Sequence, residues 1–175
     1  AEDSPPLAQT APAHVEDGDT VLDVGTGSGY VGEYVRRETG ADVVGSDLNP
    51  EACRQARARG IDVFRGDVVS AVRENAVDVV CFNPPYLPDT DEGVWDDWME
   101  AALTGGDDGR AVIEPFLDDV GRVLDPDGTV FLLLSTLTGP DEVRALAETA
   151  GFDTETVAEE SHPFERLLVF RLTPA

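Results

Sequence analysis

Apolar runs alternate with amphipathic stretches along most of this chain, and this alternation constrains the fold more than any other feature of the sequence. Seven runs have the composition of strands: Thr20 to Val24, Asp42 to Ser46, Ile61 to Phe64, Val77 to Phe82, Thr129 to Ser135, Asp153 to Glu159 and Arg166 to Leu172. Five amphipathic stretches between them have the pattern of helices: Tyr30 to Glu38, Pro50 to Arg59, Val68 to Glu74, Ala111 to Leu124 and Asp141 to Ala150. The alternation predicts an α/β fold of βαβ units around a mostly parallel sheet, and the last two runs, which are close in sequence, predict an antiparallel hairpin.

Capping residues mark the ends of several expected helices. Asn49-Pro50 places an N-cap residue before a proline at the first helical position, and Gly40, Gly60 and Gly151 stand just beyond helix ends. Ser4-Pro5-Pro6 has the same form and predicts a short helix toward Thr10, the alternative being a frayed terminus.

The 175 residues fit one domain spanning residues 1–175. Apolar residues make up 41% of the chain but form no uninterrupted stretch of about 18 residues, which excludes a transmembrane helix of the usual kind. The acidic, proline-rich beginning is not that of a signal peptide. Cys53 and Cys81 suggest neither a disulfide framework nor a metal site, so we expect a cytoplasmic protein whose metal, if any, comes with a partner.

Acidic residues far outnumber basic ones, at 36 to 12, and every basic residue is arginine. A net charge of -24 opposes binding to nucleic acid, because affinity for a polyanion depends on neutralising phosphates. Excess acid without lysine is also typical of halophilic cytoplasmic proteins, in which salt screens the repulsion between carboxylates. The charge therefore indicates habitat before it indicates a partner.

A glycine-rich segment, from Asp23 to Gly29, follows the first strand and opens the first helix. Glycines there allow a sharp turn and a ligand lying close against the backbone. Dinucleotide-binding enzymes use the same position, and residues 27–32 also satisfy their G-x-G-x-x-G pattern. Asp47 and Asp67 follow the second and third strands, where carboxylates can contact a ribose diol and an adenine amine; the alternative is an ordinary surface role.

The tetrapeptide Asn83-Pro84-Pro85-Tyr86 directly follows the fourth strand. Prolines lack an N–H group and fix the backbone, so the Pro84 carbonyl has no local helix to join. Together with the Asn83 side-chain oxygen it can accept both hydrogens of a planar NH2 group, while Tyr86 covers the face of that group. Glutamine, adenine N6 and cytosine N4 all present such a group, and an ordinary turn is the alternative interpretation.

These motifs, in this order, resemble those of class I S-adenosylmethionine-dependent methyltransferases. The Asn-Pro-Pro-Tyr form followed by Leu87 is similar to that of the HemK-type protein glutamine methyltransferases. Ala1-Glu2-Asp3-Ser4 and Gly105 to Arg110 resemble the cofactor lid and the Gly-Gly-x-x-Gly-Arg turn of the compact archaeal and eukaryotic branch, whose members modify class I release factors. The resemblance implies a Rossmann-like, seven-stranded, mostly parallel sheet with a C-terminal antiparallel hairpin and helices on both faces.

The resemblance also implies the cofactor, the site and the reaction. The cofactor is S-adenosylmethionine, and the product is N5-methylglutamine. The cofactor-binding positions are Asp3, Ser4, Asp23, Gly25, Gly27, Gly29, Asp47, Leu48, Asp67, Val68 and Asn83. The catalytic positions are Asn83, Pro84, Pro85 and Tyr86. Bacterial HemK proteins carry a helical amino-terminal domain that this chain lacks, and Pro5-Pro6 and Pro12 interrupt the expected lid segment at residues 1–15.

Substrate and partner expectations concern two further segments. Residues 87–109, the expected substrate loop, hold eight acidic residues, which favours a basic protein loop over phosphates. Trp95 and Trp98 anchor a substrate there or pack the loop onto the domain. The resemblance implies a small zinc-binding activator subunit, and Ile61 to Phe64 is an expected edge strand that either accepts it or is protected by neighbouring charges. The other functions considered are a nucleic-acid amine methyltransferase and a non-catalytic cofactor-binding module.

Overall fold

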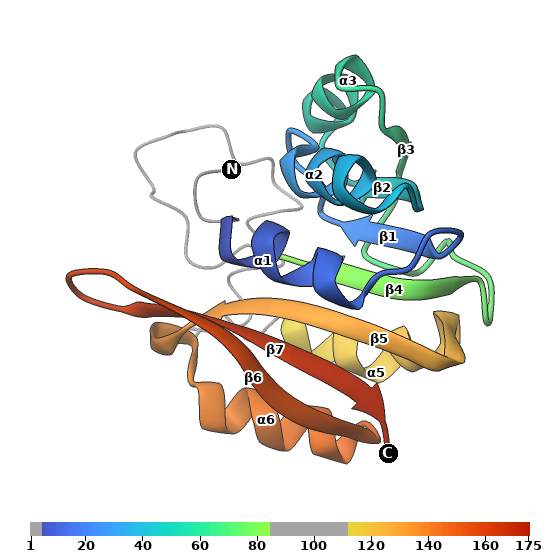
Figure 1. Cartoon of the computed structure of the whole chain (residues 1–175). Helices are drawn as coiled ribbons and strands as arrows, with labels where there is room; N and C mark the ends of the chain where they lie inside the picture. Colours follow the sequence, from blue (N-terminus) through green and yellow to red (C-terminus); the bar gives the residue numbers. More distant parts are fainter. Residues whose placement is uncertain (1–4, 85–111) are drawn as a thin grey trace.

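The protein, seen in a computed structural model, is described by the structure over residues 5–84 and 112–175 (Figure 1). Its centre is a seven-stranded sheet in the order β3-β2-β1-β4-β5-β7-β6. The strands are β1 Thr20–Val24, β2 Asp42–Asp47, β3 Asp62–Arg65, β4 Val77–Phe82, β5 Leu124–Ser135, β6 Phe152–Ser161 and β7 Arg166–Pro174. The pairs from β3 to β5 are parallel, and β7 is antiparallel to both β5 and β6, so the predicted fold class is confirmed.

Helices cover both faces of this sheet (Figure 1). They are α1 Pro5–Thr10, α2 Tyr30–Thr39, α3 Pro50–Ala58, α5 Ile113–Val123 and α6 Pro140–Thr149, with the 3-10 turns η1 Ala11–His14 and η3 Thr136–Thr138. The Asn49 side chain accepts the Glu51 N–H at 2.9 Å, and Gly40 ends α2 in the left-handed conformation, so two expected caps are confirmed.

Each face of the sheet has its own buried cluster. One packs α1, α2 and α3 against the sheet, and Leu7 and Ala8 of α1 are fully buried in it. The other packs α5 and α6 against the opposite face, where Phe82 of β4 lies 4.4 Å from Phe116 of α5 between ring centroids. The predicted short helix before Thr10 is therefore present and belongs to the core.

The predicted helix from Val68 to Glu74 is wrong, since these residues form turns. Val68 has a φ of 51°, which a helix does not accept. Arg122 of α5 donates to the carbonyls of Val69 (3.0 Å) and Val72 (2.6 Å), and Asp119 holds its guanidinium in place. A side chain distant in sequence thus takes the carbonyls that helical bonds would use, while Val69 still packs into the core.

The remaining differences are at element ends. β5 begins at Leu124, where a helix was expected to finish, because Leu124 pairs with Val77 before the ladder resumes at Thr129. The other bounds differ by a few residues at most, as is usual where elements fray. Among the described residues, no helix is both long and apolar enough to cross a membrane.

Candidate functional site

The sheet order reverses between β1 and β4, and ligands of open α/β sheets bind beyond the carboxyl ends of the strands at such a point. Val24 of β1 is in register with Ser46 of β2 and with Phe82 of β4. Three predicted features therefore meet at one edge of the sheet: the glycine loop, Asp47 and Asn83.

Glycine is needed in the loop for two different reasons. Gly25, Gly27 and Gly29 have φ values of 64°, 56° and 87°, a region that residues with a Cβ rarely adopt. A Cβ on Gly29 would lie 3.0 Å from the Ala56 Cα of α3, whereas one on Gly27 would meet no atom of the described residues within 4 Å. The loop is thus packed against α3 at Gly29 and open at Gly27, which leaves room for a ligand against its backbone.

Asp23 holds the two ends of this loop together. It is 3% exposed, and its Oδ2 accepts the Thr26 hydroxyl at 2.7 Å and the Gly32 N–H at 3.2 Å. Burial raises the pKa of Asp23 to about 7; the Thr26 and Gly32 hydrogen bonds oppose this shift, and the charge of Asp47 adds to it. The contact of Asp23 with a cofactor stays a prediction, while its bonds to the loop are structural.

Asp47 lies against the glycine loop, as its position after β2 predicted. Its Oδ2 accepts the Gly27 N–H at 3.0 Å and its Oδ1 accepts the Asn49 N–H at 2.9 Å. A carboxylate has about four lone-pair positions, so further hydrogen bonds from a ribose diol remain possible. The carbonyl of the next residue, Leu48, accepts the Arg65 Nε at 2.9 Å.

Asp67 and Val68 follow β3 beside the end of β2. The Gly66 N–H donates to the Asp47 carbonyl at 3.1 Å, and the Ser46 hydroxyl donates to the Val68 carbonyl at 3.4 Å. Asp67 is exposed and Val68 is half-buried. The structure therefore brings both predicted residues to the correct edge of the sheet, and their contact with a cofactor stays a prediction.

The turn after β4 contacts the glycine loop. Pro84 is buried and Asn83 is half-buried. A Cβ on Gly25 would lie 3.7 Å from the Phe82 ring and 3.9 Å from the Asn83 carbonyl oxygen. The backbone that begins the amine-holding turn is thus next to the loop expected to hold the cofactor. Pro85, Tyr86, Asp3, Ser4 and residues 87–109 lie outside the described residues.

Sequence reasoning missed three residues that shape the loop: Thr26, Gly32 and Gly45. The Thr26 N–H donates to the Ser46 carbonyl at 2.9 Å, and a Cβ on Gly45 would lie 2.9 Å from the Thr26 side chain. A glycine inside a strand often marks such a close approach, so Gly45 carried a usable signal. In the described part of the chain, no group of three or more His, Cys, Asp or Glu residues could hold a metal.

A sheet of this order, with a glycine loop after β1, carboxylates after β2 and β3, and an Asn-Pro turn after β4, defines a class I S-adenosylmethionine-dependent methyltransferase. Residues 21–106 match the family described as Methyltransferase domain. A Methanocaldococcus jannaschii protein provisionally named protein N5-glutamine methyltransferase MJ0928 is 33% identical over 85% of this chain and 78% of its own length. The mouse Methyltransferase HEMK2 is 30% identical over 94% of this chain and 82% of its own.

A solved structure gives the same result. The E. cuniculi Mtq2 chain superposes with a TM-score of 0.79 and 31% identity, covering 100% of this chain and 96% of that one. That structure is described as an Mtq2–Trm112 complex responsible for methylation of the eRF1 translation termination factor. The chain therefore belongs to the HemK-like family of protein N5-glutamine methyltransferases.

Proposed function

We propose that this protein transfers a methyl group from S-adenosylmethionine to the side-chain amide nitrogen of a glutamine in a protein, within the Gly-Gly-Gln loop of a class I translation release factor. One observation carries the proposal: the open glycine loop and the turn at Asn83 lie in contact at the switch point of the sheet. The names of the relatives support the same reaction, since bacterial relatives are named release factor glutamine methyltransferases.

The residues around the loop fit the cofactor. Gly27 faces open space, and Asp47 stands beside it with carboxylate lone pairs for a ribose diol. Asp67 and Val68 lie at the neighbouring strand end, where an adenine would be contacted, and Asp3 and Ser4 are proposed to close over the cofactor. Bound there, the cofactor supplies a methyl group on a positively charged sulfur.

Asn83 and the Pro84 carbonyl, here called the amide grip, are proposed to act by positioning the substrate amide. An amide nitrogen is a poor nucleophile because its lone pair is delocalised into the carbonyl. Asn83 and the Pro84 carbonyl offer two oxygen acceptors for both N–H bonds of the substrate amide, and Pro85 and Tyr86 are proposed to cover the face of that amide. The acceptors also stabilise the positive character that the nitrogen gains during attack. Orientation of this kind contributes roughly 7 to 11 kcal/mol in favourable cases. As the bond from nitrogen to the methyl carbon forms and the bond from sulfur to that carbon breaks, the nitrogen releases one proton to water.

A small activator subunit is proposed to bind at β3. Mtq2 was solved in complex with Trm112, and β3 is an edge strand of this sheet. Arg65 folds back to donate to the Leu48 carbonyl at 2.9 Å, and Arg57 of α3 donates to the Val63 carbonyl of β3 at 3.2 Å. An exposed edge can accept an added strand, and the zinc expected in the activator would come with that subunit. Solubility that depends on coexpression with the activator supports this assignment; a stable, fully active monomer would count against it.

The charge of the chain supports the proposal that the protein works in a cytoplasm of high salt, like that of a halophilic archaeon. At a net charge of -24, carboxylates repel one another strongly at low ionic strength, and the Debye length falls to roughly 3 Å at 1 M salt. Assays of this protein therefore belong in molar salt, where the fold is expected to be most stable.

The decisive assay incubates the protein and its activator with labelled S-adenosylmethionine in molar salt. It offers the release factor, a variant of it with the loop glutamine changed to alanine, DNA and RNA. Label on the unaltered release factor alone is expected; label on nucleic acid but not on release factor would overturn the proposal.

The Asn83 side chain is tested in the same assay. Asn83→Ala should reduce turnover at least a hundredfold while cofactor affinity stays within about threefold, because positioning acts on the reacting amide. Asn75→Gly is the matched control, since Asn75 lies at a φ of 50°, which glycine adopts readily, and away from the site. Equal loss in both variants would remove the proposed role of the Asn83 side chain.

A further inference from the structure

The β6–β7 hairpin projects beyond the strand ends that form the site. Phe82, at the end of β4, is level with Leu132 of β5, which is paired with Phe170 of β7. β7 begins four residues earlier, at Arg166, so the hairpin continues roughly 13 Å past the level of Phe82 at about 3.3 Å per residue. Figure 1 shows this hairpin reaching past the other strands at their carboxyl ends. The hairpin therefore extends beyond the level of the strand end that precedes Asn83.

Two exposed apolar side chains lie on the hairpin turn and on the neighbouring η3. Phe164, in the hairpin turn, is 93% exposed, and Leu137, in η3, is 71% exposed. They are the strongly exposed large hydrophobic residues of the described part of the chain. Their segments are joined, because the Arg166 N–H donates to the Thr136 hydroxyl at 3.0 Å and the Ser135 hydroxyl donates to the Glu165 carboxylate. Apolar surface is thus held in a fixed place beside the site.

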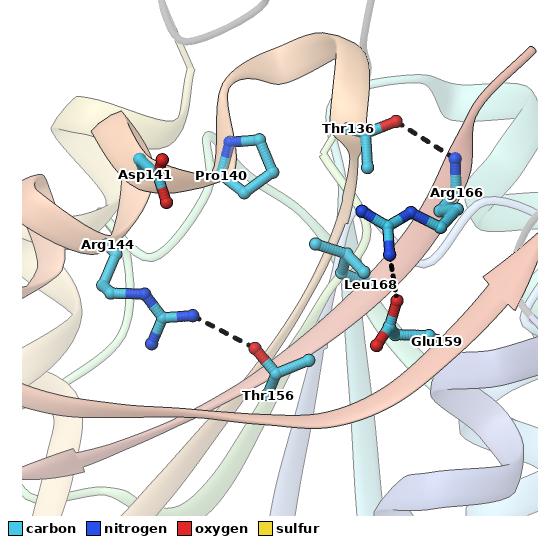
Figure 2. Close-up of a pocket in the computed structure, with 8 residues that line it drawn as sticks. All are labelled: Thr136, Pro140, Asp141, Arg144, Thr156, Glu159, Arg166 and Leu168. Carbon is cyan, nitrogen blue, oxygen red and sulfur yellow. Dashed lines mark hydrogen bonds and ion pairs between the residues drawn. The ribbon is translucent and has the colours of Figure 1, made fainter.

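A hollow of about 420 Å³ lies next to these two residues. Figure 2 shows Leu168 at its centre, with Thr136 and Arg166 on one side and Pro140 and Arg144 on the other. Thr136 precedes Leu137 and Arg166 is two residues from Phe164, so the segments that carry the apolar pair also line the hollow. We define the docking surface as Leu137, Phe164 and the residues that line this hollow.

The lining of the hollow carries two carboxylates, Asp141 and Glu159, and two arginines, Arg144 and Arg166. Its two arginines already have protein acceptors: Arg144 donates to the Thr154 carbonyl and the Thr156 hydroxyl, and Arg166 pairs with Glu159 at 2.7 Å. Glu142, Glu160 and Glu165 stand next to lining residues in the sequence and add further carboxylates, of which Glu165 accepts the Ser135 hydroxyl. An apolar centre within an acidic rim suits a basic polypeptide and repels phosphates.

We propose that the docking surface binds the protein substrate itself, through an apolar side chain flanked by basic residues, at a distance from the glutamine that is methylated. The inference rests on the proposed function and adds how the substrate is chosen. Asn83 does not line the hollow, and a protein interface burying about 800 Å² per partner is large enough to cover both places. A planar NH2 group is common to many molecules, so selection requires contacts beyond the amide grip.

Steady-state kinetics and direct binding with the release factor test this assignment in the complex with the activator. Phe164→Ser and Leu137→Ser should each raise the KM for release factor by roughly fivefold to thirtyfold, as loss of an aromatic or aliphatic anchor does. The kcat at saturating release factor and the affinity for S-adenosylmethionine should not change. Arg54→Ser, on exposed α3, is the control and should leave KM unaltered.

The outcomes separate the two proposals. If the wild-type protein methylates release factor while Phe164→Ser and Leu137→Ser both keep KM within twofold, the docking surface is refuted and the proposed function stands. If the variants instead lose the activator subunit, or lower kcat at unchanged KM, the surface serves another partner or the chemistry and the inference fails. If the wild-type protein does not methylate release factor at all, the proposed function itself fails.

Discussion

The two halves of the sheet present surfaces of different kinds at the ends of their strands. At the ends of β1, β2 and β4 the surface is made by backbone: glycines at positive φ, N–H groups bonded to Asp23 and Asp47, and a turn in contact with Gly25. At the end of β5, β7 and β6 it is made by projecting side chains over a continuous apolar core. The first surface cannot change without rebuilding its loop, whereas the second can change residue by residue while the core stays intact.

The largest expected effect is a loss of stability that leaves cofactor binding unchanged. Phe170 of β7 is fully buried, and Phe170→Ala should lower the free energy of unfolding by about 3–5 kcal/mol, through lost burial and the cavity left behind. Urea unfolding in molar salt measures this loss. Because Phe170 lies in the half remote from the glycine loop, the folded fraction should keep wild-type affinity for S-adenosylmethionine by calorimetry. A large loss of affinity would show that the halves are coupled.

A pair of glycine substitutions sharpens the comparison. Gly45→Ala places a Cβ 2.9 Å from the Thr26 side chain and should destabilise the fold by about 1–3 kcal/mol while weakening cofactor binding. Gly121→Ala in α5 is the matched control, since its Cβ would meet only Phe152 at 3.7 Å, and should stabilise the helix by about 0.5–1 kcal/mol. Similar effects of both substitutions would mean that loop packing is less constrained than the structure indicates.

The pH dependence of stability tests the buried carboxyl of the first half. The pKa of Asp23 is about 7 in the fold and 3.8 in the reference state, so the folded state holds the proton more tightly between these values. Its contribution is therefore fully present below about pH 4, falls as pH rises toward 7 and stays constant above. Asp23→Asn cannot ionise and keeps an acceptor oxygen, so the stability of the variant relative to wild type should rise across this window, by at most about 1.4 kcal/mol per pH unit.

A second substitution checks the cause of that pH dependence. The Thr26 hydroxyl lowers the pKa of Asp23 by bonding its carboxylate, so Thr26→Val should move the window to higher pH. Urea midpoints between pH 4 and 8 for the three proteins provide the measurement. A window that stays in place in Thr26→Val would contradict the assignment to Asp23.

The sequence predicted elements whose signals are local. β4 runs from Val77 to Phe82 as expected, because a strand buried on both faces has a continuous apolar run. The segment after Asp67 was mispredicted, since its carbonyls are taken by Arg122, some fifty residues away. The convergence of the glycine loop, Asp47 and Asn83 was predictable because these residues stand at strand ends. The projection of the hairpin was not, since it depends on the register of β7 against β5.

The smallest expected effect concerns Arg144, a charged residue that covers part of the half of the sheet formed by β5, β7 and β6. Its guanidinium carbon lies 4.7 Å from the centre of the Phe170 ring, and it donates to Thr154 and Thr156. Arg144→Met keeps a long apolar stem over the ring and should cost only about 0.5–1 kcal/mol in unfolding free energy. Cofactor affinity and kcat should be those of the wild type. A loss above 3 kcal/mol would mean that this polar cover is as constrained as the glycine loop, and the contrast between the two halves would no longer hold.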